Sequence, residues 1–154
     1  MSQERIAFVN ASEELLLKAR AVARRVTTRA RHVTGRPKVV LVVENDRATR
    51  QVLATLLRQE GHTVEEARDG REALERLRAG PRPDGIILDL LLPDVGGRRF
   101  RAEQLRDRDL RAIPVIVLSG EPGAPREAAE MGAVACLGKP IDFDALLGAL
   151  WRRC

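Results

Sequence analysis

The sequence predicts an α/β domain in which a parallel sheet is covered by helices on both faces. Short aliphatic runs alternate with amphipathic segments of helical spacing from residue 38 to the end of the chain. Such alternation is typical of parallel strands that are joined by crossover helices. The run at 86–88 is apolar at every position, as expected for a strand that is buried on both faces. We therefore expect five strands that alternate with five helices.

The first half of this body contains two strands and two helices, each with its own start or stop signal. Asp46 can cap a helix whose residues Val52, Leu53, Leu56 and Leu57 point inward. The expected elements are a strand at 38–43, a helix from Asp46 to Gly61, a short alternating strand at 63–66, and a helix from Asp69-Gly70 to Gly80-Pro81.

The second half contains three strands and three helices. Aliphatic runs mark the strands, and Asp142 can cap the last helix. In the helix that follows the third strand, Phe100 and Leu105 are the expected apolar residues. The expected elements are a strand at 86–88, a helix near 98–106, a strand at 114–118, a short helix around 125–131, a strand at 134–137, and a last helix that carries Phe143, Leu146, Leu147, Leu150 and Trp151.

The charge of the chain divides it into two parts. The net charge of the 154 residues is +5, yet residues 1–38 hold nine Lys/Arg against three Asp/Glu. Residues 39–154 hold the remaining 18 and 19, a net of −1. We therefore predict a basic N-terminal helical extension at 1–37 and one domain at 38–154, a size usual for a single domain.

The N-terminal extension has the features of one amphipathic helix. Ser12 can cap it, and Gly35 and Pro37 can end it. A narrow apolar stripe within a basic surface suits self-association, as a homodimer, or docking on a partner helix. A solvated helix that rests on the domain is an equally simple interpretation. Contact with a membrane surface or nucleic acid is disfavoured, since no aromatic residues are interleaved there to stack on bases.

Several classes of protein are disfavoured by what the sequence lacks. It has no apolar run of about 18 residues, so we expect no membrane span. Its N-terminus has no signal-peptide pattern, and Cys136 and Cys154 have no disulfide or metal spacing, which together favour the cytoplasm. It has no glycine-rich phosphate loop, no His or Cys paired with a base and no aromatic residue to stack on a flavin, which disfavours an α/β enzyme of this architecture, and we expect no enzyme.

Polar residues follow four of the expected strands, at the point where each strand ends. They are Glu44 and Asn45, Asp89, Ser119, and Lys139. Ligands of open α/β sheets bind outside the carboxyl ends of the strands, where the strand order reverses. Carboxylate and amide oxygens would hold Mg²⁺ there. The hydroxyl and the ammonium would complete a site for phosphoryl oxygens, with Asp89 as the nucleophile.

Residues 38–150 resemble the receiver domain of two-component response regulators, the CheY-like domains. Four motifs in the correct order carry the resemblance: Val-Val-Glu-Asn-Asp at 42–46, Leu-Asp-Leu-Leu-Leu-Pro-Asp at 88–94 with Gly97, Val-Leu-Ser-Gly at 117–120, and Gly-Lys-Pro at 138–140. The resemblance implies a flavodoxin-like, doubly wound five-stranded parallel sheet of order 2-1-3-4-5.

The resemblance also implies roles for individual residues. Asp89 matches the phosphoacceptor, and Glu44 and Asn45 match the acidic pair that holds Mg²⁺. Leu91 matches the residue whose backbone carbonyl binds the metal. Ser119 matches the switch hydroxyl that turns toward the phosphoryl group.

Three further positions match the site. Gly120 matches a small residue that leaves the site open, and Lys139 matches the lysine that pairs with the phosphoryl oxygens. The bond between Lys139 and Pro140 is usually cis in the family, although cis X-Pro bonds are a minority of about 5–6% in folded proteins.

Two positions depart from the family. Asn45 stands where a directly ligating aspartate is usual, and the loss of one negative charge should weaken Mg²⁺ binding. Cys136 stands where a Tyr or Phe usually follows the switch hydroxyl by changing rotamer. Asp46 is acidic, but its place at the helix cap would aim it elsewhere.

The resemblance implies a phosphoacceptor that receives its phosphoryl group on Asp89 from a sensor histidine kinase or phosphotransfer protein. Signalling would pass to a downstream protein partner through protein contact. The alternative is a degenerate receiver that acts as a constitutive interaction module, which Asn45 and Cys136 motivate.

Overall fold

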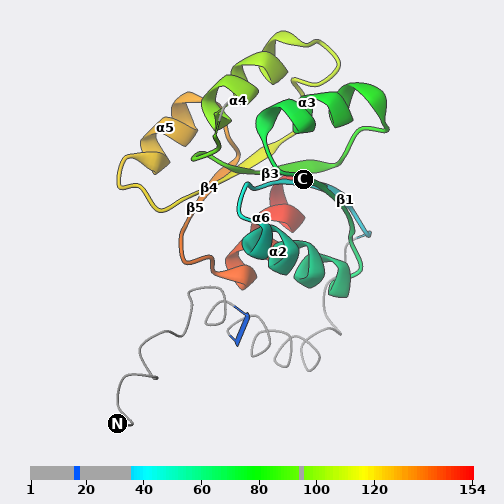
Figure 1. Ribbon diagram of the computed structural model, residues 1–154, viewed down its shortest axis with the longest axis vertical. Coiled ribbons are helices and arrows are strands. Elements are labelled where there is room, and N and C mark those ends of the chain that lie inside the picture. The colour runs from blue at the N-terminus through cyan, green and yellow to red at the C-terminus, as the bar shows by residue number, and fades with distance from the viewer. Residues whose placement is uncertain (1–15, 18–35, 94–95) are drawn as a thin grey trace, which may run out of the picture.

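The computed structural model describes residues 16–17, 36–93 and 96–154. Five parallel strands form one sheet of order β2-β1-β3-β4-β5. Figure 1 shows α3, α4 and α5 on one face of this sheet and α2 and α6 on the other. The doubly wound fold and the strand order are therefore confirmed.

The ten described elements of the domain alternate along the chain as the sequence predicts. The strands are β1 (Val39–Val43), β2 (Thr63–Ala67), β3 (Gly85–Asp89), β4 (Val115–Ser119) and β5 (Ala135–Gly138). The helices are α2 (Arg47–Gln59), α3 (Gly70–Ala79), α4 (Gly97–Arg106), α5 (Ala124–Glu130) and α6 (Phe143–Arg153).

Three helices begin at an aspartate that caps them. The side chains of Asp46, Asp69 and Asp142 accept hydrogen bonds from the backbone N–H groups three residues further on. Each cap satisfies an N–H that the first helical turn leaves unpaired, and replacing such a cap by Ala costs about 1 kcal/mol. The caps therefore fix where α2, α3 and α6 begin, just beyond the carboxyl ends of the strands before them.

The central strands feed two separate hydrophobic cores. Successive side chains of a strand point to opposite faces, so Leu41 and Val43 lie in the core beneath α3 and α4, while Val40 and Val42 lie in the core beneath α2 and α6. Burying one large aliphatic side chain contributes about 1.5–3 kcal/mol. These two cores hold the sheet rigid beneath the strand ends.

Helix α4 departs from the expected apolar pattern. Leu105 is 42% exposed, whereas the polar neighbour Gln104 is completely buried and Arg101 is 5% exposed. Gln104 Nε2 donates to the carbonyl oxygens of Leu110 and Ile113, both at 3.0 Å. The amide thus satisfies two carbonyl oxygens of the turn before β4, which is why Gln104 is buried there while the expected Leu105 is exposed.

Strand β2 forms one edge of the sheet, and charged side chains cover it. Arg58 Nη2 donates to the carbonyl oxygen of Val64 at 3.0 Å. The same guanidinium lies 3.2 Å from Glu66 Oε2, and Arg50 Nε lies 3.7 Å from Glu66 Oε1. This edge therefore has a backbone acceptor that is already bonded and a side chain that carries charge.

The chain enters the domain at the amino end of β1. Asp84 Oδ2 accepts from the backbone N–H of Val39 at 2.8 Å, and its Oδ1 pairs with Arg36 at 2.8 Å. The extension predicted at 1–37 lies almost entirely outside the described residues. Within it, Leu16 and Leu17 are described, and both are helical and exposed. Across the described ranges, none of the helices combines the length and the apolar character that crossing a bilayer requires.

Candidate functional site

The strand order places four strand tips at one edge of the sheet. β1 and β3 are neighbours in the sheet, although β2 lies between them in the chain. From β1 the chain continues to β2 on one side, and from β3 it continues to β4 on the other side, so the strand order reverses between β1 and β3. The crevice beyond such a reversal is where open α/β sheets bind ligands. The tips of β1, β3, β4 and β5 carry Glu44, Asp89, Ser119 and Lys139.

Asp89 is the last residue of β3 and is 4% exposed. Its Oδ1 accepts a hydrogen bond from the backbone N–H of Leu91 at 3.0 Å. Its Oδ2 lies 3.2 Å from Lys139 Nζ. Both carboxylate oxygens therefore have a fixed partner, which orients the group at the carboxyl end of β3.

Glu44 follows β1 and is 3% exposed. Its Oε1 accepts from the backbone N–H of Asp46 at 3.2 Å, and its Oε2 lies 3.3 Å from Lys139 Nζ. Burial, together with the charge of Asp89, raises the pKa of Glu44 to about 7, although the ammonium of Lys139 opposes the rise. Two buried carboxylates thus share one cation.

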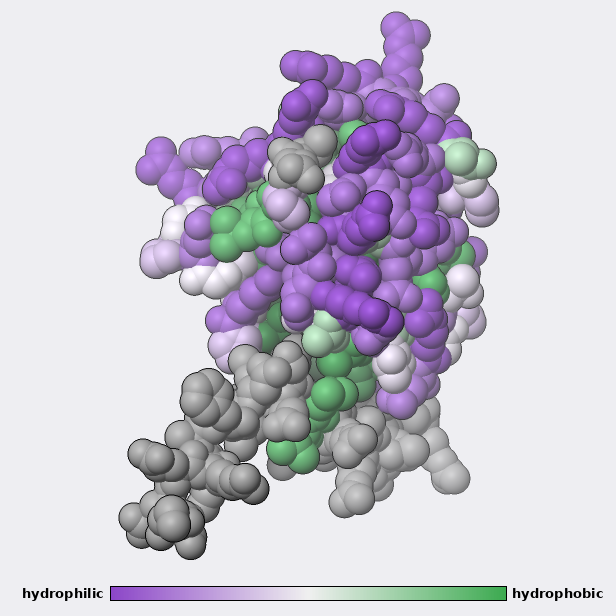
Figure 2. Space-filling model, in the orientation of Figure 1, coloured by the Kyte–Doolittle hydropathy of each residue, from purple (hydrophilic) through white to green (hydrophobic). Residues whose placement is uncertain are grey.

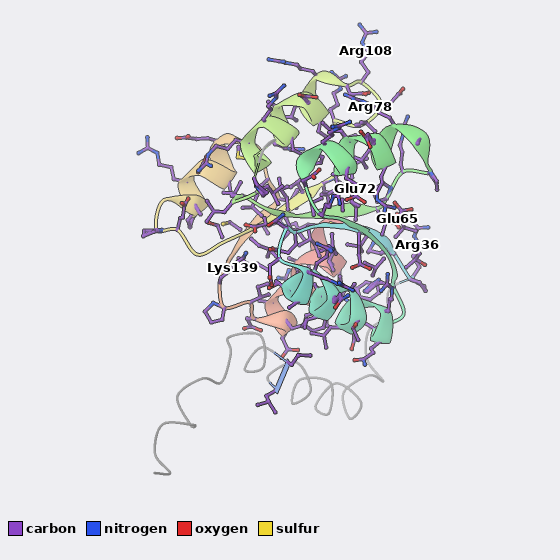
Figure 3. All side chains as sticks on the ribbon, in the orientation of Figure 1. Arg36, Glu65, Glu72, Arg78, Arg108 and Lys139 are labelled. Carbon is purple, nitrogen blue, oxygen red and sulfur yellow. The ribbon has the colours of Figure 1, made fainter. Side chains whose placement is uncertain are left out.

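Lys139, which is labelled in Figure 3, directly follows β5. Its ammonium lies within ion-pair distance of both carboxylates. Burial alone would lower its pKa, but the charges of Glu44 and Asp89 outweigh burial and raise it. The ammonium of Lys139 is therefore held in its charged form. The Lys139-Pro140 bond is cis, as the resemblance implied.

Ser119 and Gly120 line the site from β4. Ser119 is 3% exposed, and its Oγ accepts a hydrogen bond from the backbone N–H of Glu121 at 3.2 Å. Asp89 pairs in register with Leu118, so Ser119 lies one residue beyond it on the neighbouring strand. A Cβ on Gly120 would lie 3.7 Å from Lys139 Cβ, in ordinary contact.

Asn45 and Asp46 do not turn toward this cluster. The amide nitrogen of Asn45, an exposed residue, lies 3.5 Å from the carbonyl oxygen of Arg68. Asp46 Oδ2 accepts from the backbone N–H of Thr49 at 2.8 Å and from its hydroxyl at 2.6 Å, bonds that lower the pKa of Asp46. Asp46 therefore serves as the helix cap.

The donor chemistry of the cluster fits a hard divalent cation. Among the residues that the structure describes, no group of three or more His, Cys, Asp or Glu side chains is arranged to hold a metal. Two carboxylates, Glu44 and Asp89, remain, and both are buried beside the single ammonium of Lys139. Mg²⁺ commonly binds through one or two carboxylates and completes its coordination with carbonyl oxygens and water.

One residue that the sequence reasoning missed holds the loop after β1. Arg50 Nη1 donates to the carbonyl oxygen of Glu44 at 2.8 Å and to that of Asn45 at 3.3 Å. Its side chain is 16% exposed. The first turn of α2 thus places a guanidinium against the loop that precedes the helix. The signal was its position in the first turn of α2, where an inward basic residue has no place in the apolar pattern.

The family model for the response regulator receiver domain matches residues 40–150. The chain belongs to this family. A structure of the chemotaxis response regulator CheY4 of Vibrio cholerae is 32% identical, with a TM-score of 0.69, and the match covers 76% of this chain and 98% of that one. The signal receiver domain of a histidine kinase from Syntrophus aciditrophicus is 32% identical, with a TM-score of 0.68, over 75% and 88% of the two chains.

A curated relative of the receiver domain is the response regulator MprA of Mycolicibacterium vanbaalenii. It is 38% identical over 122 residues, which cover 76% of this chain and 52% of the relative. The chain therefore spans about half the length of the curated relatives it matches.

The receiver domain also shows how its unusual residue at 136 is accommodated. Cys136 is half-buried on β5 and packs against the core beneath α3 and α4. Burial raises the pKa of its thiol, so the side chain stays neutral. It fills a small apolar space.

Proposed function

We propose that this receiver domain accepts a phosphoryl group on Asp89 from the phosphohistidine of a partner histidine kinase or phosphotransfer protein. The observation that carries the proposal is the Lys139 ammonium at 3.2 Å from Asp89 and 3.3 Å from Glu44. In that arrangement the Asp89 nucleophile is oriented, and the Lys139 ammonium beside it can pair with the negative charge of the incoming phosphoryl group.

The transfer forms one bond and breaks another. A carboxylate oxygen of Asp89 attacks phosphorus, the P–N bond to the donor imidazole breaks, and the imidazole leaves with the electron pair of that bond. The product is an acyl phosphate. The Leu91 N–H and the Lys139 ammonium, which already contact Asp89, hold the carboxylate during attack, and Lys139 then pairs with a phosphoryl oxygen.

Mg²⁺ is the cofactor that we propose for this transfer. Glu44, Asn45, Asp89 and the backbone carbonyl of Leu91 would hold it. When bound, the ion neutralises charge on the phosphoryl oxygens. Asn45 would have to leave the Arg68 carbonyl or present its amide oxygen from its present position.

We propose that the output is a contact with a downstream protein in the cytoplasm. Half-buried free thiols at Cys136 and Cys154 fit a reducing compartment. The alternative is that the domain is the receiver part of a larger kinase or relay protein, an arrangement for which the similar receiver domain of the Syntrophus aciditrophicus histidine kinase is a precedent.

A second candidate is a degenerate receiver that binds its partner constitutively. Asn45 is neutral and bonded to the Arg68 carbonyl, and Asp46 is engaged as a cap. Both observations leave the site with fewer metal ligands than the family resemblance implies.

Intact mass after incubation with Mg²⁺ and acetyl phosphate separates the two candidates. Phosphorylation predicts a gain of one phosphoryl group that Asp89→Ala abolishes. Asp109→Ala, which removes a largely exposed carboxylate elsewhere, should gain the same mass as the wild type. A folded wild type that gains no mass supports the degenerate receiver, and a gain of mass in Asn45→Asp would then identify the missing charge at position 45 as the cause.

A further inference from the structure

Helix α5 has little apolar contact with the rest of the domain. It spans seven residues, and its buried members are Ala124 and Ala128. A helix this short is not stable alone, and two methyl groups bury only a small apolar area. Polar contacts must therefore decide where α5 lies.

The first of these contacts comes from the buried Arg101 on α4. Its Nε donates to the carbonyl oxygen of Met131 at 3.1 Å, and its Nη2 to that of Gly132 at 3.0 Å. Its Nη1 donates to Gln104 Oε1 at 2.7 Å. These carbonyls close the C-terminal end of α5, where a cation is favourable.

Arg101 has an unusual environment for a buried charge. Within the described ranges it forms no ion pair with a carboxylate, and burial lowers its pKa. A buried cation that lacks a counter-charge costs free energy, which its hydrogen bonds to the carbonyls must offset. A core of ordinary apolar residues would avoid that cost, so the arginine indicates a role beyond packing.

The second contact comes from Arg98, three residues earlier on the same face of α4. It binds Glu127 of α5 through both Nε and Nη2, the latter at 2.7 Å from Oε2. The same Nη2 lies 3.6 Å from Glu121 Oε2, in the loop that leaves β4. Arg98 and Arg101 together form what we call the arginine clamp.

The clamp is joined to the phosphorylation site in two ways. At the start of α4, a Cβ on Gly97 would lie 2.8 Å from the carbonyl oxygen of Asp89, so the helix begins in close contact with the acceptor. On the other side, Ser119 Oγ accepts the N–H of Glu121, whose carboxylate faces Arg98. Both connections meet at Arg98.

We propose that the arginine clamp couples phosphorylation of Asp89 to the position of α5. This inference rests on the proposed function. A phosphoryl group that draws the Ser119 hydroxyl takes away the acceptor of the Glu121 N–H. Glu121 then moves relative to Arg98, the guanidinium redistributes between its carboxylate partners, and Glu127 carries α5 with it. Arg98 and Arg101 are thus positioning residues for the signal.

Hydrogen exchange of the full chain tests this coupling, read on peptides that cover 120–133. The measurement is made with Mg²⁺, with and without acetyl phosphate, on the wild type, Arg98→Met and Arg99→Met. Arg99 is the matched control because it pairs with Glu103 within α4 and does not reach α5. A charge-swapped double variant, Arg98→Glu with Glu127→Arg, checks that the pair itself holds α5.

In the wild type, phosphorylation should raise exchange in 120–133. Without donor, Arg98→Met should already show exchange raised about fivefold, the factor expected for losing a surface charge-assisted pair. It should show no further rise with donor, while Arg99→Met responds like the wild type. The charge swap should restore protection of α5 but not the response, because the carboxylate that replaces the Arg98 guanidinium would repel Glu121.

Two results would overturn the coupling. In the first, Arg98→Met shows the same exchange in 120–133 as the wild type, both without and with donor. In the second, the wild type is phosphorylated but its exchange in α5 does not change. The second result leaves the proposed function intact, because the mass gain is measured on the same sample. Failure to gain mass refutes the proposed function instead, and the comparison of Arg98→Met with Arg99→Met without donor still decides whether the clamp holds α5.

Discussion

At the level of single residues, the electrostatics of the site depend on the burial of Glu44. Its carboxylate lies beside that of Asp89 and shares one ammonium with it. Burial and like charge raise its pKa to about 7, above the ordinary value of 4.5. The folded state therefore binds the Glu44 proton more tightly than the unfolded chain does.

The raised pKa gives a stability prediction with a definite sign. The contribution of Glu44 is fully present below about pH 4.5 and is lost as the pH rises through about 7. Without divalent ions, the free energy of unfolding of the wild type should fall relative to that of Glu44→Gln by up to about 3 kcal/mol between about pH 5 and pH 8. Urea unfolding of both proteins measures the difference.

The wild type must be compared with Glu44→Gln because His62 changes the free energy of unfolding in the opposite direction as the pH rises. Burial lowers the pKa of His62, so its contribution weakens as the pH falls. Glu75→Gln, at an exposed helix position, should show the pH dependence of the wild type. A Glu44→Gln protein whose pH dependence equals that of the wild type would contradict the raised pKa.

Leu91 controls water access to the acceptor in our interpretation. Its side chain is 55% exposed and its N–H is bonded to Asp89. Leu91→Asn should shorten the lifetime of the acyl phosphate, by roughly tenfold or less, because an amide can position the attacking water. Loss of the phosphoryl mass with time measures it. Leu105→Asn, at another exposed leucine, is the control, and a longer lifetime in Leu91→Asn would refute the shielding.

At the level of elements, the sequence predicts where helices and strands lie better than it predicts which side chains of α4 are buried. Its period identified the helix and Phe100 correctly, yet it assigned Leu105 inward, where the structure has Gln104. A hydrophobic pattern cannot reveal a polar residue that is buried because backbone carbonyls need its donors. The burial of Arg101 against the carbonyl oxygens that end α5 escaped prediction for the same reason.

The site itself was predictable only in part. Strand-end positions pointed to Glu44, Asp89 and Lys139, and those three side chains do meet. Composition could not show that Asn45 lies against the Arg68 carbonyl, since that contact depends on the conformation of two loops. Polar residues at strand ends thus predict an approximate location, and side-chain direction requires the structure.

Helix α4 gives a prediction about packing. A Cβ on Gly97 would lie 2.8 Å from Asp89 O and 2.9 Å from Leu90 Cα, both backbone atoms that cannot move aside cheaply. Gly97→Ala should therefore destabilise the domain by about 2 kcal/mol or more and lower phosphorylation. Gly123→Ala, where a Cβ meets nothing within 4 Å, should change the free energy of unfolding by about 0.5 kcal/mol or less. Equal midpoints in urea for the two variants would show that α4 is free to shift.

At the level of the whole molecule, the outer surface of α3 and α4 is polar. Figure 2 shows hydrophilic side chains over these two helices, and Figure 3 shows Arg78 on α3 and Arg108 in the loop after α4. Arg78 lies 3.8 Å from Glu103, one of several exposed pairs that contribute little to stability but keep the surface soluble. Self-association would therefore need a different surface.

The N-terminal extension is the segment that we expect to supply it. Deletion of residues 1–35 should weaken concentration-dependent self-association, because it removes the predicted apolar stripe. Sedimentation equilibrium of the full and truncated chains measures the effect. Monomers of both forms at high concentration would exclude this role of the extension.

The charged side chains that cover the β2 edge of the sheet limit how copies of the protein can associate. A neighbouring chain that extended the sheet there would have to displace Arg58 from the Val64 carbonyl and break one of the two ion pairs of Glu66. Ribbon-like stacking of one sheet onto the next is thus blocked on this side. The β2 edge is therefore a poor template for fibres.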